Sequence, residues 1–209
     1  MSIMVIDVID VGAGNVVSVK NWIERCNIAA NIVNSTSQLR SEMVVLPGVG
    51  SAGPFMELLR KNNFDTALKD HVSSGKRTIG ICLGFQLMMD YSEEDGAVQG
   101  LGLLSGHVER LRGVVSHNGW EPFQLKRSDL KETSIRGHHN LTRKQVLHGR
   151  VFYNHEYGVV SREASAFSLT VSTELSDYSG LVIKDNIIGL QFHPEKSQRT
   201  GADLLTLLM

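Results

Sequence analysis

The seven residues from Gly80 to Gln86, with the sequence GICLGFQ, constrain the fold of this chain more than any other stretch. They follow a run of mostly β-branched residues that predicts a strand, and they lead into an apolar run, residues 85–91, that predicts a helix. Cys82 lies two positions from a glycine on either side, the spacing of a Gly-x-nucleophile-x-Gly turn. A side chain on such a strained turn needs small neighbours, because only glycine lets the surrounding backbone come close.

This position leaves two interpretations of Cys82. A sulfur exposed at a helix N-terminus is favoured as the thiolate by the helix dipole, and the thiolate is the nucleophilic form of cysteine. The alternative is an inert cysteine buried in a core strand, since buried free cysteines are common. The flanking Gly80 and Gly84 shift the balance toward the reactive interpretation.

The length and composition of the chain are those of an ordinary globular protein. Its 209 residues are 42% hydrophobic and 21% charged, enough for one substantial α/β domain, which we expect to span residues 1–209. The net charge of −1 gives no general attraction to nucleic acid or to an anionic membrane. No long apolar run and no secretion signal are visible, so we expect a cytoplasmic protein whose Cys26 and Cys82 are free thiols.

The order of the predicted elements indicates an α/β fold. An apolar run from Met4 to Val11, a glycine turn, a helical pattern from Val16 to Cys26 and a strand from Ala29 to Val33 form the start of a parallel sheet. Residues 55–72 predict a helix interrupted near two asparagines. The second half contains short strands and tight turns, and Asn118-Gly119 is a strong hairpin signal. We therefore predict a mostly parallel central sheet flanked by helices, with added antiparallel strands in the second half.

Two glycine-rich segments raise the alternative of a non-catalytic nucleotide-binding module. The segment from Gly48 to Gly53, GVGSAG, fits the Gly-x-Gly-x-x-Gly pattern and follows a predicted strand. Prolines flank it on both sides, however, and the one nearby acidic residue at a suitable distance for binding a ribose, Asp70, falls in a predicted helix. The turn at residues 12–14 lacks the third glycine of the same pattern.

The stretch from Lys126 to Arg150 is the least regular part of the chain, and we predict a surface loop or a helical insertion there. It contains His138, His139 and His148. Their spacing matches no common metal-ligand motif and no cysteine lies nearby, so we expect no metal.

A second set of candidate catalytic residues follows the last predicted strand. His193 and Glu195 are two positions apart, so on extended backbone both side chains would project to the same side. A cysteine nucleophile needs a base for its proton, and the imidazole needs a carboxylate to fix its tautomer. Candidate donors for an oxyanion are the amide of Leu83 and, in a glycine-rich loop after a neighbouring strand, the amides of Val49 and Gly50.

Together these motifs resemble the two signatures of class I glutamine amidotransferases, GICLGFQ at residues 80–86 and QFHPE at residues 191–195. The resemblance runs nearly end to end and is strongest to the glutaminase subunits of imidazole glycerol phosphate synthase. Four further segments carry it: LPGVG at residues 46–50, SEE at residues 92–94, His117-x-Gly119-Trp120, and HPEKS at residues 193–197.

The resemblance implies a function for the chain. It would hydrolyse L-glutamine to glutamate and ammonia without a cofactor. The ammonia would pass to a (β/α)8-barrel cyclase, the partner in a heterodimer that makes imidazole glycerol phosphate for histidine biosynthesis.

The resemblance also implies roles for individual residues. The catalytic residues would be the nucleophile Cys82, the base and acid His193, and its orienting partner Glu195. L-glutamine would be bound by Gln86 and Glu94 and by backbone groups of His155, Glu156 and Tyr157, and the barrel would be faced by Trp120 and Lys196.

Four residues depart from the family pattern. Asn118 and Glu121 stand in HNGWE where the family usually has HMGWN, and Asn154 and Glu156 stand in NHEY where it usually has VHSY or VHTY. These changes leave open a second hypothesis, in which a related glutaminase subunit supplies ammonia to a barrel that aminates a surface-polysaccharide sugar.

Overall fold

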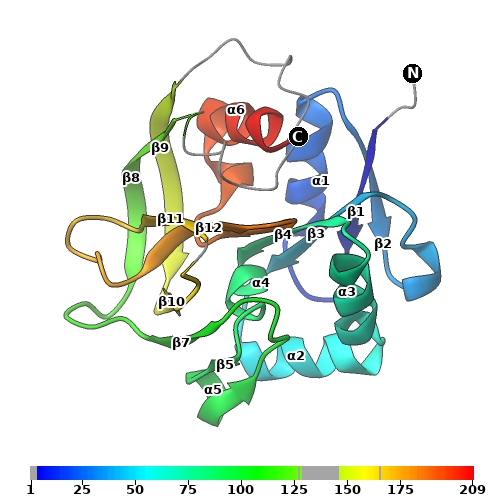
Figure 1. Ribbon diagram of the computed structural model, residues 1–209, viewed down its shortest axis with the longest axis horizontal. Coiled ribbons are helices and arrows are strands. Elements are labelled where there is room, and N and C mark those ends of the chain that lie inside the picture. Colours follow the sequence, from blue (N-terminus) through cyan, green and yellow to red (C-terminus); the bar gives the residue numbers. More distant parts are fainter. Residues whose placement is uncertain (1–3, 127, 129–145, 165) are drawn as a thin grey trace.

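The computed structural model describes residues 4–126, 128, 146–164 and 166–209. Most of the predicted insertion, with His138 and His139, lies outside these residues. The described chain forms a seven-stranded sheet, a four-stranded sheet and a two-stranded ribbon, with helices around them (Figure 1). Within the described part, no helix has the length and apolar character that crossing a bilayer requires.

The seven-stranded sheet forms the centre of the fold and is mostly parallel. Across the sheet the order is β11 (Phe167–Thr170), β12 (Ser179–Lys184), β13 (Ile187–Leu190), β4 (Arg77–Cys82), β3 (Met43–Gly48), β1 (Val5–Ile9) and β2 (Ala29–Val33). Five neighbouring strands run parallel, and at one edge β12 pairs antiparallel with both of its neighbours. Together with the antiparallel strands of the second half described below, this confirms the predicted fold class.

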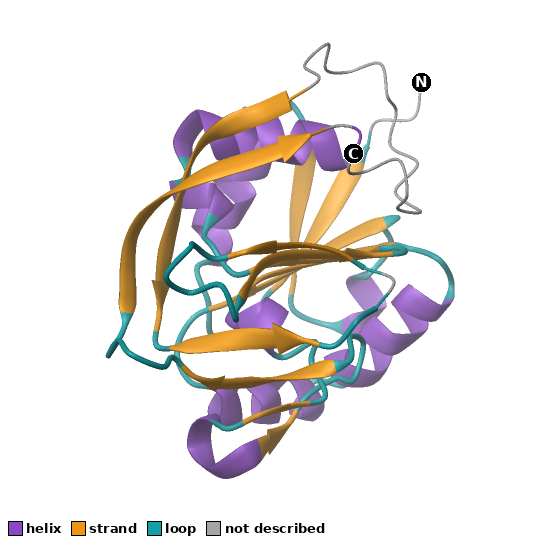
Figure 2. Ribbon diagram, turned by 60° about the vertical axis from the view of Figure 1, so that its left-hand side comes forward, coloured by secondary structure: helices purple, strands orange, loops and turns teal. Residues whose placement is uncertain are grey.

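Helices cover both faces of this sheet (Figures 1 and 2). Helices α1 (Val16–Arg25) and α6 (Gln198–Leu208) lie on one face, and α2 (Ala52–Lys61) and α3 (Phe64–Ser73) on the other. The sequence of strand β3 is continuously apolar because both of its faces are buried. Met43 and Val45 pack into the core under α1 and α6, whereas Val44 and Leu46 pack into the core under α2 and α3. Each such buried aliphatic side chain contributes about 1.5–3 kcal/mol to stability.

The second half adds the predicted antiparallel strands. A smaller sheet has the order β10 (Tyr157–Ser161), β7 (Gly106–Arg110), β5 (Tyr91–Ser92) and β6 (Val98–Gln99). Strands β8 (His117–Lys126) and β9 (Val146–His155) form a long antiparallel ribbon beside α6 (Figure 1). The hairpin turn predicted at Asn118-Gly119 is wrong, because both residues lie inside β8 and pair with β9, which is distant in sequence.

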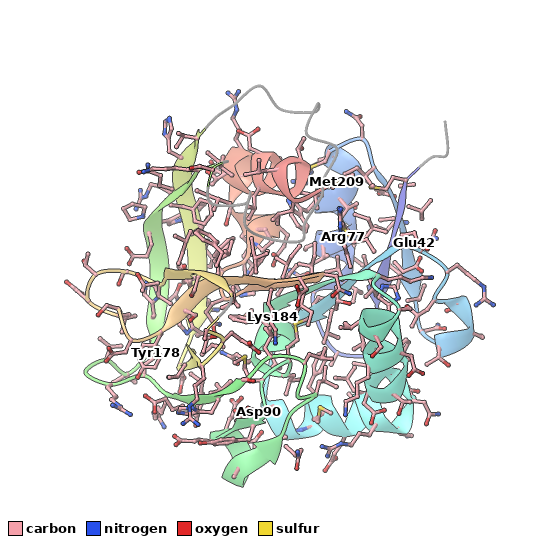
Figure 3. All side chains as sticks on the ribbon, in the orientation of Figure 1. Glu42, Arg77, Asp90, Tyr178, Lys184 and Met209 are labelled. Atoms are coloured by element: carbon pink, nitrogen blue, oxygen red, sulfur yellow. The ribbon has the colours of Figure 1, made fainter. Side chains whose placement is uncertain are left out.

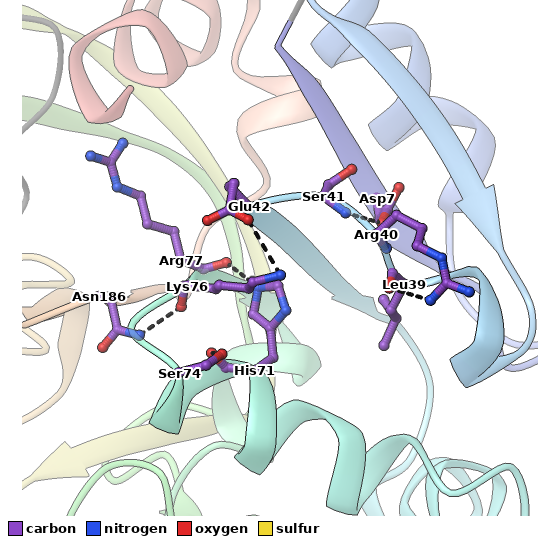
Figure 4. A network of polar contacts seen from close by, with 10 residues as sticks. All are labelled: Asp7, Leu39, Arg40, Ser41, Glu42, His71, Ser74, Lys76, Arg77 and Asn186. Carbon is purple, nitrogen blue, oxygen red and sulfur yellow. Dashed lines mark hydrogen bonds and ion pairs between the residues drawn. The ribbon is translucent and has the colours of Figure 1, made fainter. Parts of the chain in front are cut away.

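Polar contacts join the segments that precede β3 and β4 (Figure 4). The buried Asp7 carboxylate accepts backbone N–H groups of Arg40 and Ser41 at 2.8 and 2.9 Å. On the other side of this network, Asn186 Nδ2 donates to the carbonyl of Lys76 at 2.6 Å. Arg77 also donates to the carbonyl of Met209 at 2.8 Å, which attaches the end of α6 to β4 (Figure 3).

Candidate active site

Cys82 ends β4 and directly precedes α4 (Leu83–Gln86), the single helical turn that follows it. Its backbone has φ of +53° and ψ of −112°, a conformation that is strained for any residue with a side chain. The predicted helix over residues 85–91 is much shorter than expected. The carbonyls of residues 87–90 accept N–H groups of residues 100–104 from the chain returning after β6, so the helical pattern stops.

The glycines around Cys82 are required by close backbone contacts. A Cβ atom on Gly84 would lie 2.0 Å from the carbonyl oxygen of Leu46, and one on Gly80 would lie 2.7 Å from Cα of Phe85. Gly48 is paired with Cys82 between β3 and β4, and a Cβ there would lie 2.4 Å from the amide nitrogen of Gly84. The loop after β3, with Val49 and Gly50, therefore begins directly beside the strained turn.

His193 and Glu195 meet as predicted, although not on one strand. β13 ends at Leu190, and the backbone of His193 is extended and donates to the carbonyl of Phe152 at 2.8 Å. Glu195 lies in the short 3₁₀ helix η3 (Pro194–Lys196). The turn at Pro194 brings Glu195 Oε1 to 2.8 Å from His193 Nδ1, and both side chains are almost completely buried.

The His193 ring lies between Cys82 and Glu195 and forms a hydrogen bond with the side chain of each. Burial opposes the charged form of the ring, but the hydrogen bonds to Cys82 and Glu195 and their negative charges outweigh it and raise the pKa of His193 to about 9. At neutral pH the ring is therefore an imidazolium, held beside the sulfur on one side and the carboxylate on the other.

A cavity of about 390 Å³ opens above the sulfur, and its wall contains most of the predicted site residues. Glu195 lies behind His193 and is not part of the wall. Trp120 lies elsewhere. The lining residues are Val49, Gly50, Cys82, Leu83, Gln86, Glu94, Ser116, Asn154, His155, Glu156, Tyr157, His193 and Lys196.

The acidic segment after β5 supports the start of α2. Glu94 accepts the backbone N–H of Ala52 at 3.1 Å, and Asp95 accepts the N–H of Gly53 at 2.9 Å and the hydroxyl of Ser51. Burial raises the pKa of Glu94, and the charges of Asp95 and Glu156 act in the same direction, although the bond from Ala52 opposes them. The segment that carries the predicted substrate carboxylate thus also anchors the residues that follow the Val49-Gly50 loop.

His155, in the cavity wall, begins a row of polar side chains that continues through His117 to Glu121. His155 Nδ1 lies 2.8 Å from the carbonyl of Tyr157, and His155 Nε2 lies 3.2 Å from His117 Nδ1. His117 Nε2 in turn lies 3.0 Å from Glu121 Oε1. Burial lowers the pKa of His155 to about 4, and the charges of His117 and His193 add to this effect, so the His155 ring is neutral at neutral pH.

The two residues expected to face a partner both contact one aromatic ring. Trp120 pairs with Phe152 across β8 and β9, with ring centroids 5.6 Å apart, and Lys196 Nζ lies 5.5 Å from the centre of the Phe152 ring. Trp120 also borders a separate hollow formed with Arg150 and residues 197–200. Lys196 connects this surface to the catalytic cavity, because it lines that cavity too.

Gln191 and Asp95 were not predicted as site residues. The Gln191 side chain is buried, with Nε2 at 3.8 Å from Cys82 Sγ, and Asp95 holds the segment that follows the glycine loop. A signal for Gln191 exists in the sequence, because it is a polar residue in an apolar strand and lies two positions before His193. For Asp95 the only signal is its position next to Glu94.

Comparisons with known proteins show which family the chain belongs to. The model of the family described as "Glutamine amidotransferase class-I" matches residues 7–207. The chain is 34% identical over 207 residues to the imidazole glycerol phosphate synthase subunit HisH of Gloeothece citriformis, covering 97% of this chain and 93% of that protein. It is 36% identical over 209 residues to the HisH subunit of Geobacillus thermodenitrificans, covering 96% of this chain and 92% of that protein.

Two solved structures share the fold. The structure of PurLQS from Thermotoga maritima gives a TM-score of 0.74 at 17% identity, covering 99% of this chain and 98% of that chain. A structure described as a glutamine amidotransferase gives a TM-score of 0.68 at 20% identity, covering 97% and 96%. The family match over almost the whole chain, with relatives above 30% identity, shows that this protein belongs to the class I glutamine amidotransferase family and is an enzyme of that family.

Proposed function

We propose that this protein hydrolyses L-glutamine to glutamate and ammonia, with Cys82, His193 and Glu195 as its catalytic residues. The observation that carries the proposal is the continuous contact from the Cys82 side chain through the His193 ring to the buried Glu195 carboxylate. Cys82 stands on a strained turn at the base of a cavity, which is where a nucleophile must be exposed to a substrate.

The reaction follows from this arrangement. The Cys82 thiolate attacks the side-chain amide carbon of glutamine, and the negative charge on the amide oxygen is stabilised by backbone N–H groups of Leu83, Val49 and Gly50. The His193 imidazolium gives its proton to the departing nitrogen, which leaves as ammonia, and a glutamyl thioester remains. His193, now neutral, takes a proton from water as it attacks the thioester, and glutamate is released.

The cavity supplies groups suited to the amino-acid end of glutamine. Glu94 lies in the wall with a carboxylate that can bind the substrate ammonium, and Gln86 lies beside the sulfur. Backbone groups of His155, Glu156 and Tyr157 complete the same wall. We assign substrate binding to these five residues.

The proposed destination of the ammonia is a (β/α)8-barrel cyclase that makes imidazole glycerol phosphate for histidine biosynthesis. The curated relatives are named as HisH subunits of imidazole glycerol phosphate synthase, which supports this acceptor. We propose that residues 1–209 form one amidotransferase domain that pairs with the barrel in the cytoplasm. Trp120 and Lys196, which both contact the Phe152 ring, are the proposed contacts.

The test is Cys82→Ala assayed in complex with the barrel subunit. The variant should lose glutamine-dependent product formation and keep ammonia-dependent synthesis, because the barrel's own chemistry does not use Cys82. Persistent turnover with glutamine would contradict the catalytic assignment. Parallel assays with a barrel that aminates a sugar test the choice of acceptor separately.

A further inference from the structure

The carbonyl oxygen of Tyr157 fixes the direction of the hydrogen bonds that lead to the catalytic sulfur. It lies 2.7 Å from Nε2 of Gln86. A carbonyl oxygen can only accept a hydrogen bond, so the atom of Gln86 that faces it must be the amide nitrogen. The orientation of the Gln86 amide is therefore determined by a backbone group that cannot reverse its role.

The same reasoning determines the orientation of the next amide. Gln86 Nε2 also lies 3.2 Å from Oε1 of Gln191. Because Nε2 of Gln86 can only donate hydrogen bonds, the atom of Gln191 that faces it must be the amide oxygen. The nitrogen at the other end of the Gln191 amide then faces Cys82, with Nε2 at 3.8 Å from Sγ. Of the two possible orientations of the Gln191 amide, only this one satisfies both contacts.

We propose that Gln191 is a further catalytic residue, which donates a hydrogen bond to Sγ of Cys82 and stabilises its thiolate while Gln86 holds the amide in place. The proposal rests on the proposed function only in taking Cys82 as the nucleophile. Gln191 is fully buried, at 0% exposure, so water does not compete for this donor.

The other neighbours of the sulfur explain why such a donor is needed. The carbonyl oxygen of Asn154 lies 3.9 Å from Sγ, where it can accept from the thiol but repels the thiolate. The Gln191 N–H group has the opposite effect, since a hydrogen bond to a charged partner is stronger than one between neutral groups. His193 and Gln191 thus both favour the thiolate, the first by charge and the second through a neutral donor.

This arrangement also gives Gln86 a second task. Both N–H bonds of its amide nitrogen point to groups of the protein, the Tyr157 carbonyl and the Gln191 amide oxygen. Only the amide oxygen of Gln86 can then accept from a substrate. Gln86 is a positioning residue for Gln191 as well as part of the cavity wall.

The test is the rate at which iodoacetamide alkylates Cys82 across a range of pH, in the wild-type chain and in Gln191→Met. Methionine has a similar length and volume but no N–H donor. The rate measured with Cys82→Ala is subtracted to remove any reaction of Cys26. We expect Gln191→Met to react about fivefold more slowly than the wild type near neutral pH. The difference should disappear at alkaline pH, because the thiolate then forms without the help of a hydrogen-bond donor.

Two further variants complete the test. Gln86→Met leaves the Gln191 amide in place but free to turn, so it should show a smaller loss with the same pH dependence, and it tests the proposal even if Gln191→Met does not fold. Gln99→Met, at an exposed position on β6, should react as the wild type does.

Two outcomes would overturn the proposal. One is a profile for Gln191→Met identical to that of the wild type. The other is a loss of equal size at every pH, which a distorted turn or a blocked cavity would produce. Alkylation does not require glutamine turnover. A Gln191 effect on alkylation in a chain without glutaminase activity would therefore count against the proposed function and not against this inference.

Discussion

Glu195 contacts the His193 ring through one oxygen, Oε1, at 2.8 Å, whereas Oε2 is buried and has no hydrogen-bond partner among the described residues. The Glu195 carboxylate therefore interacts mainly with the imidazole, because no other described group forms a hydrogen bond with it. The charge is therefore balanced by the imidazolium, and the carboxylate stabilises the charged form of the His193 ring.

Glu195→Gln should preserve the shape of this contact and remove its charge. Without the carboxylate, the pKa of His193 should fall from about 9. The imidazolium that protonates the departing ammonia is then lost at lower pH, so the alkaline limb of the kcat/KM profile should move to lower pH. We expect kcat for glutamine to fall about 10²- to 10⁴-fold. The measurement is glutamate release by the complex across a range of pH, and an unchanged alkaline limb would contradict the role of Glu195.

Gly84→Ala should destabilise the fold, because the added Cβ would lie 2.0 Å from the Leu46 carbonyl oxygen in the adjacent strand. Neither group can move without shifting β3 or the turn after Cys82. We expect the free energy of unfolding to fall by about 2–4 kcal/mol in urea denaturation. Gly119→Ala is the matched control, since a Cβ there meets nothing within 4 Å, and it should change stability by no more than about 0.5 kcal/mol.

Glu121→Gln should change the protonation of His117 and leave the tautomer of His155 unchanged. The Tyr157 carbonyl requires a proton on His155 Nδ1, so His155 Nε2 accepts from His117 Nδ1. His117 Nε2 then faces a carboxylate, which also only accepts, and a proton must lie between them. We expect this proton on the imidazole, so that His117 carries protons on both nitrogens.

Nitrogen-15 NMR of histidine-labelled protein measures both rings directly. In the wild type, His155 should be the neutral Nδ1–H tautomer and His117 the imidazolium. In Glu121→Gln the side-chain amide can donate to His117 Nε2, so His117 should become neutral. A neutral His117 in the wild type would show that the proton lies on Glu121 instead.

Asp7→Asn should destabilise the protein at neutral pH, and the loss of stability should be smaller in acid. Burial disfavours the Asp7 carboxylate, but the N–H groups of Ser41 and Arg40 and the amide of Asn31 outweigh it and hold the pKa below the ordinary 3.8. The carboxylate therefore stabilises the folded state above pH 3.8, and this contribution disappears as the pH falls through the lowered value. We expect a loss of about 1–2 kcal/mol at neutral pH from urea denaturation. A loss that stays constant into acid would contradict the assignment.

The parts of the site that could be predicted from the sequence are those formed within short segments. Gly80 and Gly84 are needed because the backbone packs closely around Cys82. His193 and Glu195, which contact each other, are only two positions apart. The order of strand, glycine turn, helix and strand from Met4 to Val33 also predicted a parallel sheet.

The parts that could not be predicted depend on which strands pair. Asn118-Gly119 has the composition of a tight turn, yet pairing with Asn154 and Tyr153 of β9 holds it in a strand. The same register places His117 opposite His155, a contact that no local pattern indicates. Gln191 reaches the sulfur only because β13 pairs with β4, which ends at Cys82.

The contact between Glu94 and the N–H of Ala52 has a consequence for ligand binding. Ala52 begins α2, directly after the loop that contains Val49 and Gly50. A cationic group that binds the same Glu94 oxygen, Oε2, would compete with this N–H, and cavity occupancy and the anchoring of the loop would then be coupled equilibria. By reciprocity, a contact that stabilises the anchored loop would change the affinity of the cavity for such a ligand by the same factor by which the ligand changes the stability of that contact.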